Sequence, residues 1–492
     1  MKKLIFFLLL SQNLSAQSNE DKIKAIVPEL DAKFEAFRTQ NHLSSVSYAV
    51  LVDGKIVHQS NRGTVNYKTN KIADNQSVYR IASMSKSFAS VAILQLRDAG
   101  KLKLDDPVWK YIPELRGQKY SADSPDITVR HLLTHAAGFP EDNPWGDRQL
   151  GITEAEMLKM FKKGISFSNE PGVAYEYSNM GFAMLGQIIK NVSGQSYQSY
   201  IINKIWKPLG MNNTYWDYTK VPDNQLVRGY RWLREQYIEQ PFEGDGAYGI
   251  MGGILTSIED FSKYMVFHQK AYQVNAPNSP ILKKSSLKEM HFPANFGSMN
   301  NRGFTGSGEP CNNVSFYGYG LRIDQNCNQI RSIGHSGGLP GFGSDWKIVP
   351  QYGIGIVTFT NGTYGSAALM NNQIVPYIIE KAGISPIPFP VSPILKQRQN
   401  ELVKLLPSWE GAEKTGIFAE NFFMDYFPDL LKAEAEGIFD KVGKIVKINE
   451  IVPENALRGK FLIECEKGKV EVSFTMSPEN PPLIQAYSIK LK

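Results

Sequence analysis

A serine and a lysine three residues apart can supply a nucleophile and the base that activates it, and Ser83 and Lys86 have this spacing. They stand at the start of an apolar run, SMSKSFASVAILQLRDA, which ends before Gly100 and predicts a buried helix over residues 83–99. Residues three apart lie on one face of a helix. Burial disfavours the charged form of a lysine and lowers its pKa, so the Lys86 amine would be able to take the proton of the Ser83 hydroxyl.

The same spacing recurs at Ser285 and Lys288, so a second sequence feature is needed to identify the site. Tyr177 and Asn179 form the only Tyr-x-Asn in the chain, which follows Ser83 but precedes Ser285. A tyrosine whose pKa is lowered could move the proton from the serine to the leaving group. The amide of Asn179 could hold a substrate carbonyl. We therefore expect Tyr177 and Asn179 to act with Ser83.

The stretch GHSGG, which contains Ser336, has the G-x-S-x-G pattern that presents a nucleophilic serine at a strand-to-helix turn in α/β-hydrolases. In those enzymes the catalytic histidine follows the serine, whereas all 7 histidines of this chain precede Ser336. The segment that follows is rich in Gly and Pro and then strand-like. We interpret His335, Ser336 and Gly337 as a third group on a strand edge. We expect the Gly338 N–H to join that of Ser83 in an oxyanion hole.

The order Ser-x-x-Lys, Tyr-x-Asn, His-x-Gly resembles the serine β-lactamase and penicillin-binding protein superfamily, above all its class C β-lactamase-related branch with D,D-peptidases, D-aminopeptidases and esterases. The stretches ITVRHLLTHAAGFP, KPLGMNNTYW and GGILTSIEDFSKYM look like that branch too, and the resemblance spans about residues 25–380. It implies an acyl-enzyme on Ser83, with Lys86 and Tyr177 as the shared acid and base. His335 would be a proton-network or substrate-anchoring group. The residues that it assigns to substrate binding are Asn179, Ser336 and Gly337.

The resemblance leaves the substrate open between a D-amino-acid peptide, an ester and a β-lactam. Many β-lactamases carry a Lys-Thr-Gly third motif whose lysine is a permanent cation suited to a substrate carboxylate, whereas His335 is mostly neutral at pH 7. Peptidase or esterase activity is therefore more expected than efficient β-lactam hydrolysis. A literal Lys-Thr-Gly at 414–416 runs into a helix-like segment, so we interpret it as a chance match. The alternative is a non-catalytic or slowly turning over protein that binds or senses penicillin or cell-wall peptides.

The composition narrows the classes of partner and cofactor. The chain has 492 residues, of which 42% are hydrophobic and 21% charged, with a net charge of +6, as is ordinary for a globular protein. No basic run is paired with stacking aromatics, so we expect a small-molecule or peptide substrate and no nucleic acid. His131 and His135 have the spacing of a zinc site, but Leu132 stands where a zincin has its glutamate, so we expect no metal and no cofactor. The sequence does not specify an oligomeric state.

The N-terminus, MKKLIFFLLLSQNLSAQ, predicts a signal peptide over residues 1–16 from its lysines, short apolar core and Leu-Ser-Ala cleavage site. That core is too short to span a bilayer, so we expect an exported protein, periplasmic or secreted, with no stable membrane span. Export exposes cysteines to an oxidising environment. Cys311 and Cys327 flank a strand-like run and could form a disulfide that leaves Cys465 over, or all three could be small apolar fillers.

The elements that must position these residues are strands on either side of a helical middle. Residues 45–61 predict two strands joined by an Asp-Gly turn. Helical patterns and loops dominate from about 80 to 310, and strands return over 316–361 as an antiparallel meander. We expect an α/β (α+β) fold, with an antiparallel sheet flanked by helices and a mostly helical insertion. The resemblance implies the β-lactamase/transpeptidase-like version of it.

Two domains are expected in the mature chain. The serine hydrolase domain would cover residues 20–384, and a Pro-rich linker would follow over 385–400, where SPIPFPVSP is extended and stiff. Residues 401–492 predict a small α+β domain of unknown role, with a helix over 417–440 that is interrupted at Pro428.

Overall fold

The computed structural model describes residues 17–492, so the predicted signal peptide over residues 1–16 lies outside the described residues. The chain divides between Ser385 and Pro386 into two compact units, each with its own hydrophobic core. No helix within residues 17–492 combines the length and the apolarity needed to cross a membrane.

The first unit is built on a nine-stranded antiparallel sheet in the order β3-β2-β1-β14-β13-β12-β11-β10-β9. Early strands pair with late ones, since Val46 of β1 lies opposite Thr360 of β14. The predicted sheet, closed by both ends of the domain, is confirmed. Its strands are β1 (Ser45–Val52), β2 (Lys55–Asn66), β3 (Lys71–Ile72), β9 (Asn295–Phe304), β10 (Pro310–Tyr317), β11 (Arg322–Asn326), β12 (Arg331–Leu339), β13 (Phe342–Val349) and β14 (Ile354–Thr360).

Local sequence explains most of these strands, with one exception. Asp53 and Gly54 join β1 to β2, and their φ angles of +47° and +80° are those of the tight turn that an Asp-Gly pair favours. The exception is β9, the edge strand, which falls inside the stretch predicted to be helical. Its sequence, NFGSMNNRGF, lacks the alternation of apolar and polar residues that marks a strand.

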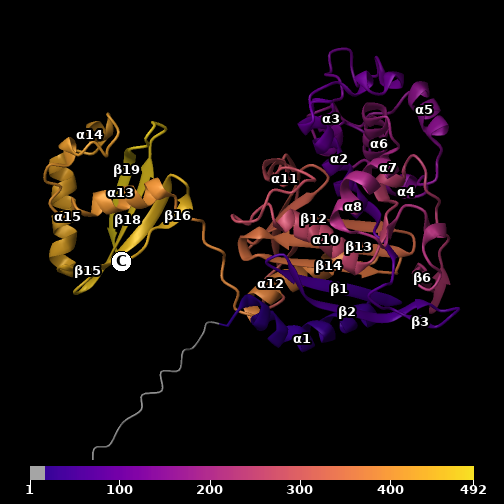
Figure 1. The fold of residues 1–492 in the computed structure, drawn as a ribbon, viewed down its shortest axis with the longest axis horizontal. Helices are drawn as coiled ribbons and strands as arrows, with labels where there is room; N and C mark the ends of the chain where they lie inside the picture. Colours follow the sequence, from indigo (N-terminus) through magenta and orange to yellow (C-terminus); the bar gives the residue numbers. More distant parts are fainter. Residues whose placement is uncertain (1–16) are drawn as a thin grey trace, which may run out of the picture. The chain divides into compact units, whose positions relative to one another are not determined.

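The sheet is covered on both faces. α1 (Asn19–Gln40) and α12 (Ala367–Lys381) pack on one face, and helices of the insertion, α10 (Ile258–Gln269) among them, pack on the other (Figure 1). Neighbouring residues of a strand point to opposite faces. Val50 of β1 therefore joins the core under α1 and α12, whereas Leu51 joins the core on the insertion side.

The insertion between β3 and β9 is mostly helical, as predicted, with short strands that form separate small sheets. Its helices are η1 (Ala82–Ser85), α2 (Lys86–Asp98), η2 (Val108–Lys110), η3 (Pro113–Leu115), α3 (Val129–Leu133), α4 (Asn143–Gly146), α5 (Glu154–Lys163), α6 (Asn179–Ser193), α7 (Tyr197–Ile201), η4 (Ile202–Trp206), α8 (Lys207–Leu209), η5 (Tyr218–Lys220), α9 (Gly249–Gly252), α10 and α11 (Lys284–Met290). Its strands are β4 (Tyr79–Arg80), β5 (Thr214–Tyr215), β6 (Tyr230–Leu233), β7 (Gln236–Glu239) and β8 (Leu255–Thr256). η6 (Pro350–Tyr352) lies outside it, between β13 and β14.

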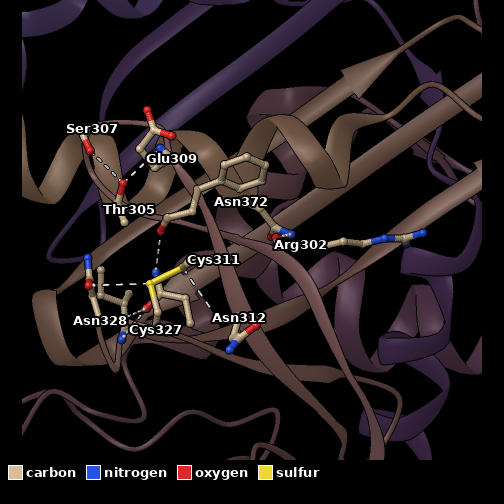
Figure 2. The surroundings of a disulfide bond; sticks show 12 residues. Arg302, Thr305, Ser307, Glu309, Cys311, Asn312, Cys327, Asn328 and Asn372 are labelled. Carbon is tan, nitrogen blue, oxygen red and sulfur yellow. Dashed lines mark hydrogen bonds between the residues drawn. A yellow bond between two sulfur atoms is a disulfide. The ribbon is translucent and has the colours of Figure 1, made fainter.

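A disulfide closes one end of the sheet. Cys311 on β10 and Cys327, in the turn after β11, are bonded with their Cα atoms 6.0 Å apart (Figure 2). Figure 2 also shows the neighbouring β9–β10 turn, where the Glu309 N–H donates to the Thr305 hydroxyl (3.1 Å). Of the two possibilities that the sequence leaves open, the structure has the disulfide, and Cys465 is a free thiol in the second unit.

The second unit is a small α+β domain, as predicted. Its first helix, α13, begins at Pro393, and the Leu395 side chain is buried in the core of this unit. The predicted linker over 385–400 is therefore too long, because Pro at the first position starts a helix well. For the same reason Pro428 begins α15, and the predicted interruption of the helical stretch 417–440 is found there, since the preceding helix ends at Asp425. The elements are α13 (Pro393–Val403), η7 (Ala412–Lys414), α14 (Phe422–Asp425), α15 (Pro428–Val442), β15 (Ile445–Ile448), β16 (Val452–Asn455), β17 (Arg458–Cys465), β18 (Gly468–Met476) and β19 (Ile484–Leu491).

Candidate active site

Ser83 lies in the short 3₁₀ helix η1, which leads directly into α2. The backbone before it is fixed to the sheet, because the Ser344 hydroxyl of β13 donates to the Ile81 carbonyl (2.7 Å). Ala82 has a φ of +48°, a left-handed conformation that is strained for a residue with a Cβ. Sequence patterns predict only the start of a helix here. The structure adds a strained turn that leaves 7% of the Ser83 surface exposed.

Lys86 follows one turn later and is fully buried. Its Nζ lies 3.0 Å from Ser83 Oγ, 2.7 Å from Asn179 Oδ1 and 2.8 Å from the Met251 carbonyl oxygen. Burial lowers the pKa of Lys86 to about 7, although two nearby carboxylates oppose the shift. The lowered lysine pKa that the sequence predicts is therefore found.

A neutral Lys86 amine fits these contacts well. It has two N–H donors for the Asn179 and Met251 oxygens, which leaves its lone pair for the Ser83 hydroxyl. In that form the amine can accept the serine proton. With a pKa of about 7, a large fraction of Lys86 is neutral at physiological pH.

Tyr177 lies beside the same amine, with its ring centroid 4.9 Å from Lys86 Nζ. Burial raises the pKa of the Tyr177 phenol, and the neighbouring Ser83 hydroxyl opposes the shift only in part. The predicted lowering of the tyrosine pKa is therefore wrong. Desolvation disfavours the phenolate more than the surrounding charges favour it. In this state Tyr177 is a neutral phenol, able to pass on a proton but not to act as a phenolate base.

Asn179 is the first residue of α6 and is fully buried. The Asp142 carboxylate accepts from its backbone N–H (2.6 Å) and from that of Met180 (2.9 Å), which fixes the start of the helix. The Asn179 amide is occupied within the protein, since Oδ1 accepts from Lys86 Nζ and Nδ2 donates to Asn143 Oδ1 (3.0 Å). A substrate carbonyl would have to replace one of these bonds, and the predicted substrate contact stays a prediction.

His335 is buried on β12, and both of its ring nitrogens are occupied. Nδ1 donates to the Ser336 carbonyl, which can only accept, so Nε2 of the neutral ring accepts from the Tyr317 hydroxyl (2.9 Å). Burial lowers the pKa of His335 well below its usual value, and nearby cations act in the same direction. His335 thus connects to Tyr177 through Tyr317, whose ring meets that of Tyr177 edge-on at a centroid distance of 6.5 Å. Its catalytic role stays a prediction.

The third motif packs directly against the turn that carries the serine. A Cβ on Gly337 would lie 2.3 Å from the Ile81 carbonyl oxygen, so only glycine allows β12 to approach η1 this closely. Ser336, Gly337 and Gly338 are partly exposed, unlike the buried part of the strand before them. The backbone N–H groups of Ser83 and Gly338 come from these two adjoining segments. Their use as an oxyanion hole stays a prediction.

Two other segments that matched a motif lie elsewhere. GHSGG belongs to β12 and is followed by another strand, β13, not by a helix, so Ser336 is not at a nucleophile elbow. The Lys-Thr-Gly at 414–416 is an exposed turn of the second unit. It is therefore not part of the meander that carries His335.

Charged groups surround the Lys86 amine. The Asp147 carboxylate accepts from the Tyr364 hydroxyl (2.9 Å), and burial raises the pKa of this carboxyl to about 6. Arg322, at the start of β11, lowers the pKa values of both Lys86 and His335. An arginine keeps its charge at any physiological pH. Arg322 is therefore a permanent cation within electrostatic reach of the site.

Sequence reasoning misses several groups at the site, three of them in contact with its central residues. Tyr317 occurs in a stretch that the sequence identifies only as a strand, and the Met251 carbonyl could come from any residue type, so neither gives a signal. His135 gives one. It lies in ITVRHLLTHAAGFP, a stretch that carries the family resemblance, but the sequence suggests it only as a metal ligand. In the structure its ring packs against that of Tyr177.

Comparison with known proteins gives a consistent family. A family model described as Beta-lactamase matches residues 30–376. Protein flp from Staphylococcus aureus (strain NCTC 8325 / PS 47) is 28% identical over 364 residues, which cover 72% of this chain and 65% of that protein. Beta-lactamase-like protein 2 from Dictyostelium discoideum is 27% identical over 356 residues, 70% of this chain and 61% of that protein. The chain thus spans less than two thirds of the length of these relatives.

Solved structures share the fold. An octameric penicillin-binding protein homologue from Pyrococcus abyssi has a TM-score of 0.60 and 23% identity, over 95% of this chain and 100% of its own. A class C beta-lactamase has a TM-score of 0.57 and 22% identity, over 74% of this chain and 98% of its own. A penicillin-binding protein from Bacillus halodurans has a TM-score of 0.54 and 22% identity, over 69% and 97%. The predicted resemblance and fold class are confirmed.

Proposed function

The chain belongs to the beta-lactamase family, and from this premise we propose that it is an exported serine hydrolase that cleaves an amide or ester through an acyl-enzyme on Ser83. One observation carries the proposal. Lys86 Nζ lies 3.0 Å from Ser83 Oγ, and the pKa of this amine is about 7. A buried neutral amine next to a hydroxyl can generate a serine nucleophile at neutral pH.

In the acylation step, the Lys86 amine takes the Ser83 proton as Oγ attacks the substrate carbonyl carbon. The carbonyl oxygen becomes an oxyanion, which the N–H groups of Ser83 and Gly338 would stabilise. The bond from the carbonyl carbon to the leaving nitrogen or oxygen then breaks. The proton on Lys86 passes to the leaving group with the neutral Tyr177 phenol as a relay, and the acyl group remains as an ester on Ser83.

Deacylation would use the same groups in reverse. Water occupies the place of the leaving group, gives a proton to Lys86 and attacks the acyl carbon. The ester bond to Ser83 breaks, the acid product leaves, and the proton returns to the serine oxygen. The raised pKa of Tyr177 and the lowered pKa of Lys86 support this division of roles between relay and base.

We infer that Arg322 favours a substrate that carries a carboxylate, against the opposing charges of Asp142 and Asp147. Because His335 is neutral, it cannot supply the positive charge that the lysine of a Lys-Thr-Gly motif would. Arg322 is a permanent positive charge that acts on His335 and could take that place. A D-amino-acid peptide with a free C-terminus and a β-lactam both carry a carboxylate, whereas a simple alkyl ester does not. We expect carboxylate-bearing substrates to react faster than uncharged esters with the same leaving group.

A second candidate function is a penicillin-binding or cell-wall-peptide-sensing protein that is acylated but turns over slowly. Both ring nitrogens of His335 are occupied, so within residues 17–492 the group placed to activate water is the same Lys86 amine that activates Ser83. Two of the similar structures are a penicillin-binding protein and a homologue of one. The lifetime of the acyl-enzyme separates this candidate from the first.

Export is part of the proposal. The signal peptide predicted over residues 1–16 supports it, and so does the disulfide between Cys311 and Cys327. Disulfides persist in oxidising compartments and are rare in the cytosol. Fractionation of cells that express the full chain, with N-terminal sequencing of the product, would test it. A mature protein that begins after Ala16 outside the cytoplasm is the expected result, and an intact cytoplasmic chain would contradict it.

Intact-protein mass spectrometry tests the hydrolase proposal. The wild-type chain, Ser83→Ala and the matched control Ser285→Ala are each incubated with a fluorophosphonate and, separately, with penicillin. We expect one fluorophosphonate adduct on the wild type and on Ser285→Ala, and none on Ser83→Ala. An unchanged adduct on Ser83→Ala would refute the proposal.

The penicillin adduct and substrate turnover then decide between the two candidates. A short-lived adduct, with Ser83-dependent release of product from a D-amino-acid peptide or ester, indicates a hydrolase. An adduct that persists for hours without turnover of any of these substrates indicates the slowly deacylating binding protein.

A further inference from the structure

His135 has an environment that the proposed mechanism does not yet use. It follows α3, it is buried, and its φ of +54° is left-handed for a residue with a side chain. Its Nε2 is buried and has no hydrogen-bond partner within residues 17–492. A strained backbone and an unpaired polar atom both destabilise the folded state. Their coincidence at one residue is typical of a functional site.

The contacts of His135 are with the two residues that flank Tyr177. The His135 carbonyl accepts from the Glu176 N–H (2.8 Å), and its Nδ1 accepts from the Ser178 N–H (3.1 Å). A single residue thereby fixes the backbone both before and after Tyr177. His135 thus has a left-handed backbone and contacts this one segment through both its carbonyl and its ring.

The ring of His135 also packs against the tyrosine that these bonds fix. The centroids of His135 and Tyr177 are 4.2 Å apart, and those of His135 and Tyr317 are 4.5 Å apart. His135 therefore contacts both the phenol beside Lys86 and the tyrosine that donates to His335. The imidazole thus packs directly against the Tyr177 ring.

The protonation state of His135 is set by its surroundings. Because Nδ1 accepts from a backbone N–H, the neutral ring carries its proton on Nε2. Burial lowers the pKa of His135 well below its usual value, and the positive charges of Lys86 and Arg322 act in the same direction. The tyrosines that contact the ring are neutral. His135 and the tyrosines in contact with it thus keep one protonation state across the pH range in which Lys86 titrates.

We propose that His135 is a positioning residue for the reaction at Ser83: it fixes the Tyr177 phenol against Lys86 through two backbone hydrogen bonds and the face of its ring. This inference rests on the proposed function and assigns no proton transfer to His135 itself. Misplacement of a catalytic group by about 1 Å can reduce a rate on the order of a hundredfold. Loss of these contacts should therefore reduce kcat while leaving KM nearly unchanged.

Two substitutions separate the hydrogen bond to the Ser178 N–H from the ring contact with Tyr177. His135→Phe retains a flat ring but removes the acceptor for the Ser178 N–H. His135→Asn retains an acceptor at the equivalent atom and tolerates the left-handed backbone, but it removes the ring. His131→Asn is the matched control, since its Nδ1 also accepts a backbone N–H, that of Thr128 at 3.3 Å.

The measurements are kcat and KM per reactive site, with the reactive sites counted by fluorophosphonate titration, and the thermal midpoint of each variant. We expect kcat to fall about a hundredfold in His135→Phe and about tenfold in His135→Asn, with KM within threefold. His131→Asn should stay within twofold of wild type. A lower thermal midpoint with unchanged kcat per reactive site in both His135 variants would overturn the proposal.

A double-mutant cycle keeps the test decisive if His135→Phe does not fold. If His135 acts through Tyr177, His135→Asn should cost about tenfold in the wild-type background but less than twofold in Tyr177→Phe. An equal loss in both backgrounds would refute a positioning role. Failure of the proposed function itself has a different signature, because Ser83→Ala would then keep its activity or its fluorophosphonate adduct.

Discussion

Two helical segments of the first unit share the Ser-x-x-Lys pattern, and only one of them is placed to do chemistry. At the start of α2, Ser83 and Lys86 are buried, and the lysine amine has oxygen neighbours at 2.7 to 3.0 Å. On α11, Ser285 and Lys288 are exposed, and the Lys288 ammonium lies over the Tyr272 ring at 5.8 Å. The spacing is identical, so the difference comes from what surrounds each helix.

The difference is one of helix faces. α2 is buried on nearly all sides, so any residue in its first turn is removed from water. α11 buries only the face that carries Ser286, Leu287 and Met290, and its serine-lysine pair falls on the opposite face. In both helices the spacing aligns a hydroxyl and an amine. Only burial lowers the pKa of the amine enough for it to act as a base.

The largest predicted effect is on the two lysines. Lys86→Met removes the base but retains a buried unbranched side chain, and we expect kcat/KM to fall by about a thousandfold or more, within the range for loss of a general base. Lys288→Met should change kcat/KM by less than twofold. Steady-state hydrolysis of one carboxylate-bearing substrate by both variants measures this. Comparable losses in the two variants would abolish the distinction between α2 and α11.

The next effect is on the pH dependence of acylation. The active form of Lys86 is neutral, and its pKa is about 7. The acylation rate should therefore rise with pH, level off above this value, and fall about tenfold per pH unit below it, or about a hundredfold by pH 5. Stopped-flow acylation by a chromogenic substrate gives the profile. A flat profile between pH 5 and pH 8 would mean that Lys86 is not the base.

Much of this site can be predicted from the chain alone. Ser83, Lys86, Tyr177, Asn179 and His335 follow from spacing and order, since each motif is local. The sheet also follows from local signals, because strands such as β1 and β2 flank a recognisable Asp-Gly turn.

What sequence could not predict depends on contacts between distant segments. The raised pKa of Tyr177 results from burial among residues from several elements, whereas the relay role expected from the sequence assumes a lowered pKa. The hydrogen bond at Nε2 of His335 depends on Tyr317, 18 positions earlier. At Pro393 the prediction fails for a local reason. A proline-rich stretch predicts an extended linker, but the last proline of this stretch starts α13.

A third prediction concerns the pKa of Lys86, which a nearby carboxylate should raise toward that of an exposed lysine. Asn179→Asp places a carboxylate at the position of an amide whose Oδ1 lies 2.7 Å from Lys86 Nζ. An adjacent negative charge favours the ammonium and raises a lysine pKa by about 1 to 3 units. The acylation profile should shift to higher pH, with a loss of about tenfold or more at pH 7 and recovery at alkaline pH. A shift in the other direction would contradict the role assigned to burial.

The smallest effect concerns two glycines, Gly337 at the end of His-Ser-Gly and Gly416 at the end of Lys-Thr-Gly. A Cβ at Gly337 would lie 2.3 Å from the Ile81 carbonyl oxygen, whereas nothing lies within 4 Å of one at Gly416. Gly337→Ala should therefore displace β12 from the serine turn and reduce kcat/KM by about tenfold, as expected for a small loss of alignment. Gly416 has a φ of +68°, so Gly416→Ala should cost about 1 kcal/mol of unfolding free energy in the second unit, with unchanged kcat/KM.

Kinetics and thermal unfolding of these two variants measure both effects on the same preparations. If Gly416→Ala reduces kcat/KM as much as Gly337→Ala does, the Lys-Thr-Gly turn contributes to the active site, and the second unit has a catalytic role. If only Gly337→Ala does so, close packing of β12 on η1 distinguishes a working motif from a chance match, as burial distinguishes Lys86 from Lys288. In both comparisons the residue types are supplied by the sequence, but their chemistry depends on the neighbouring segments.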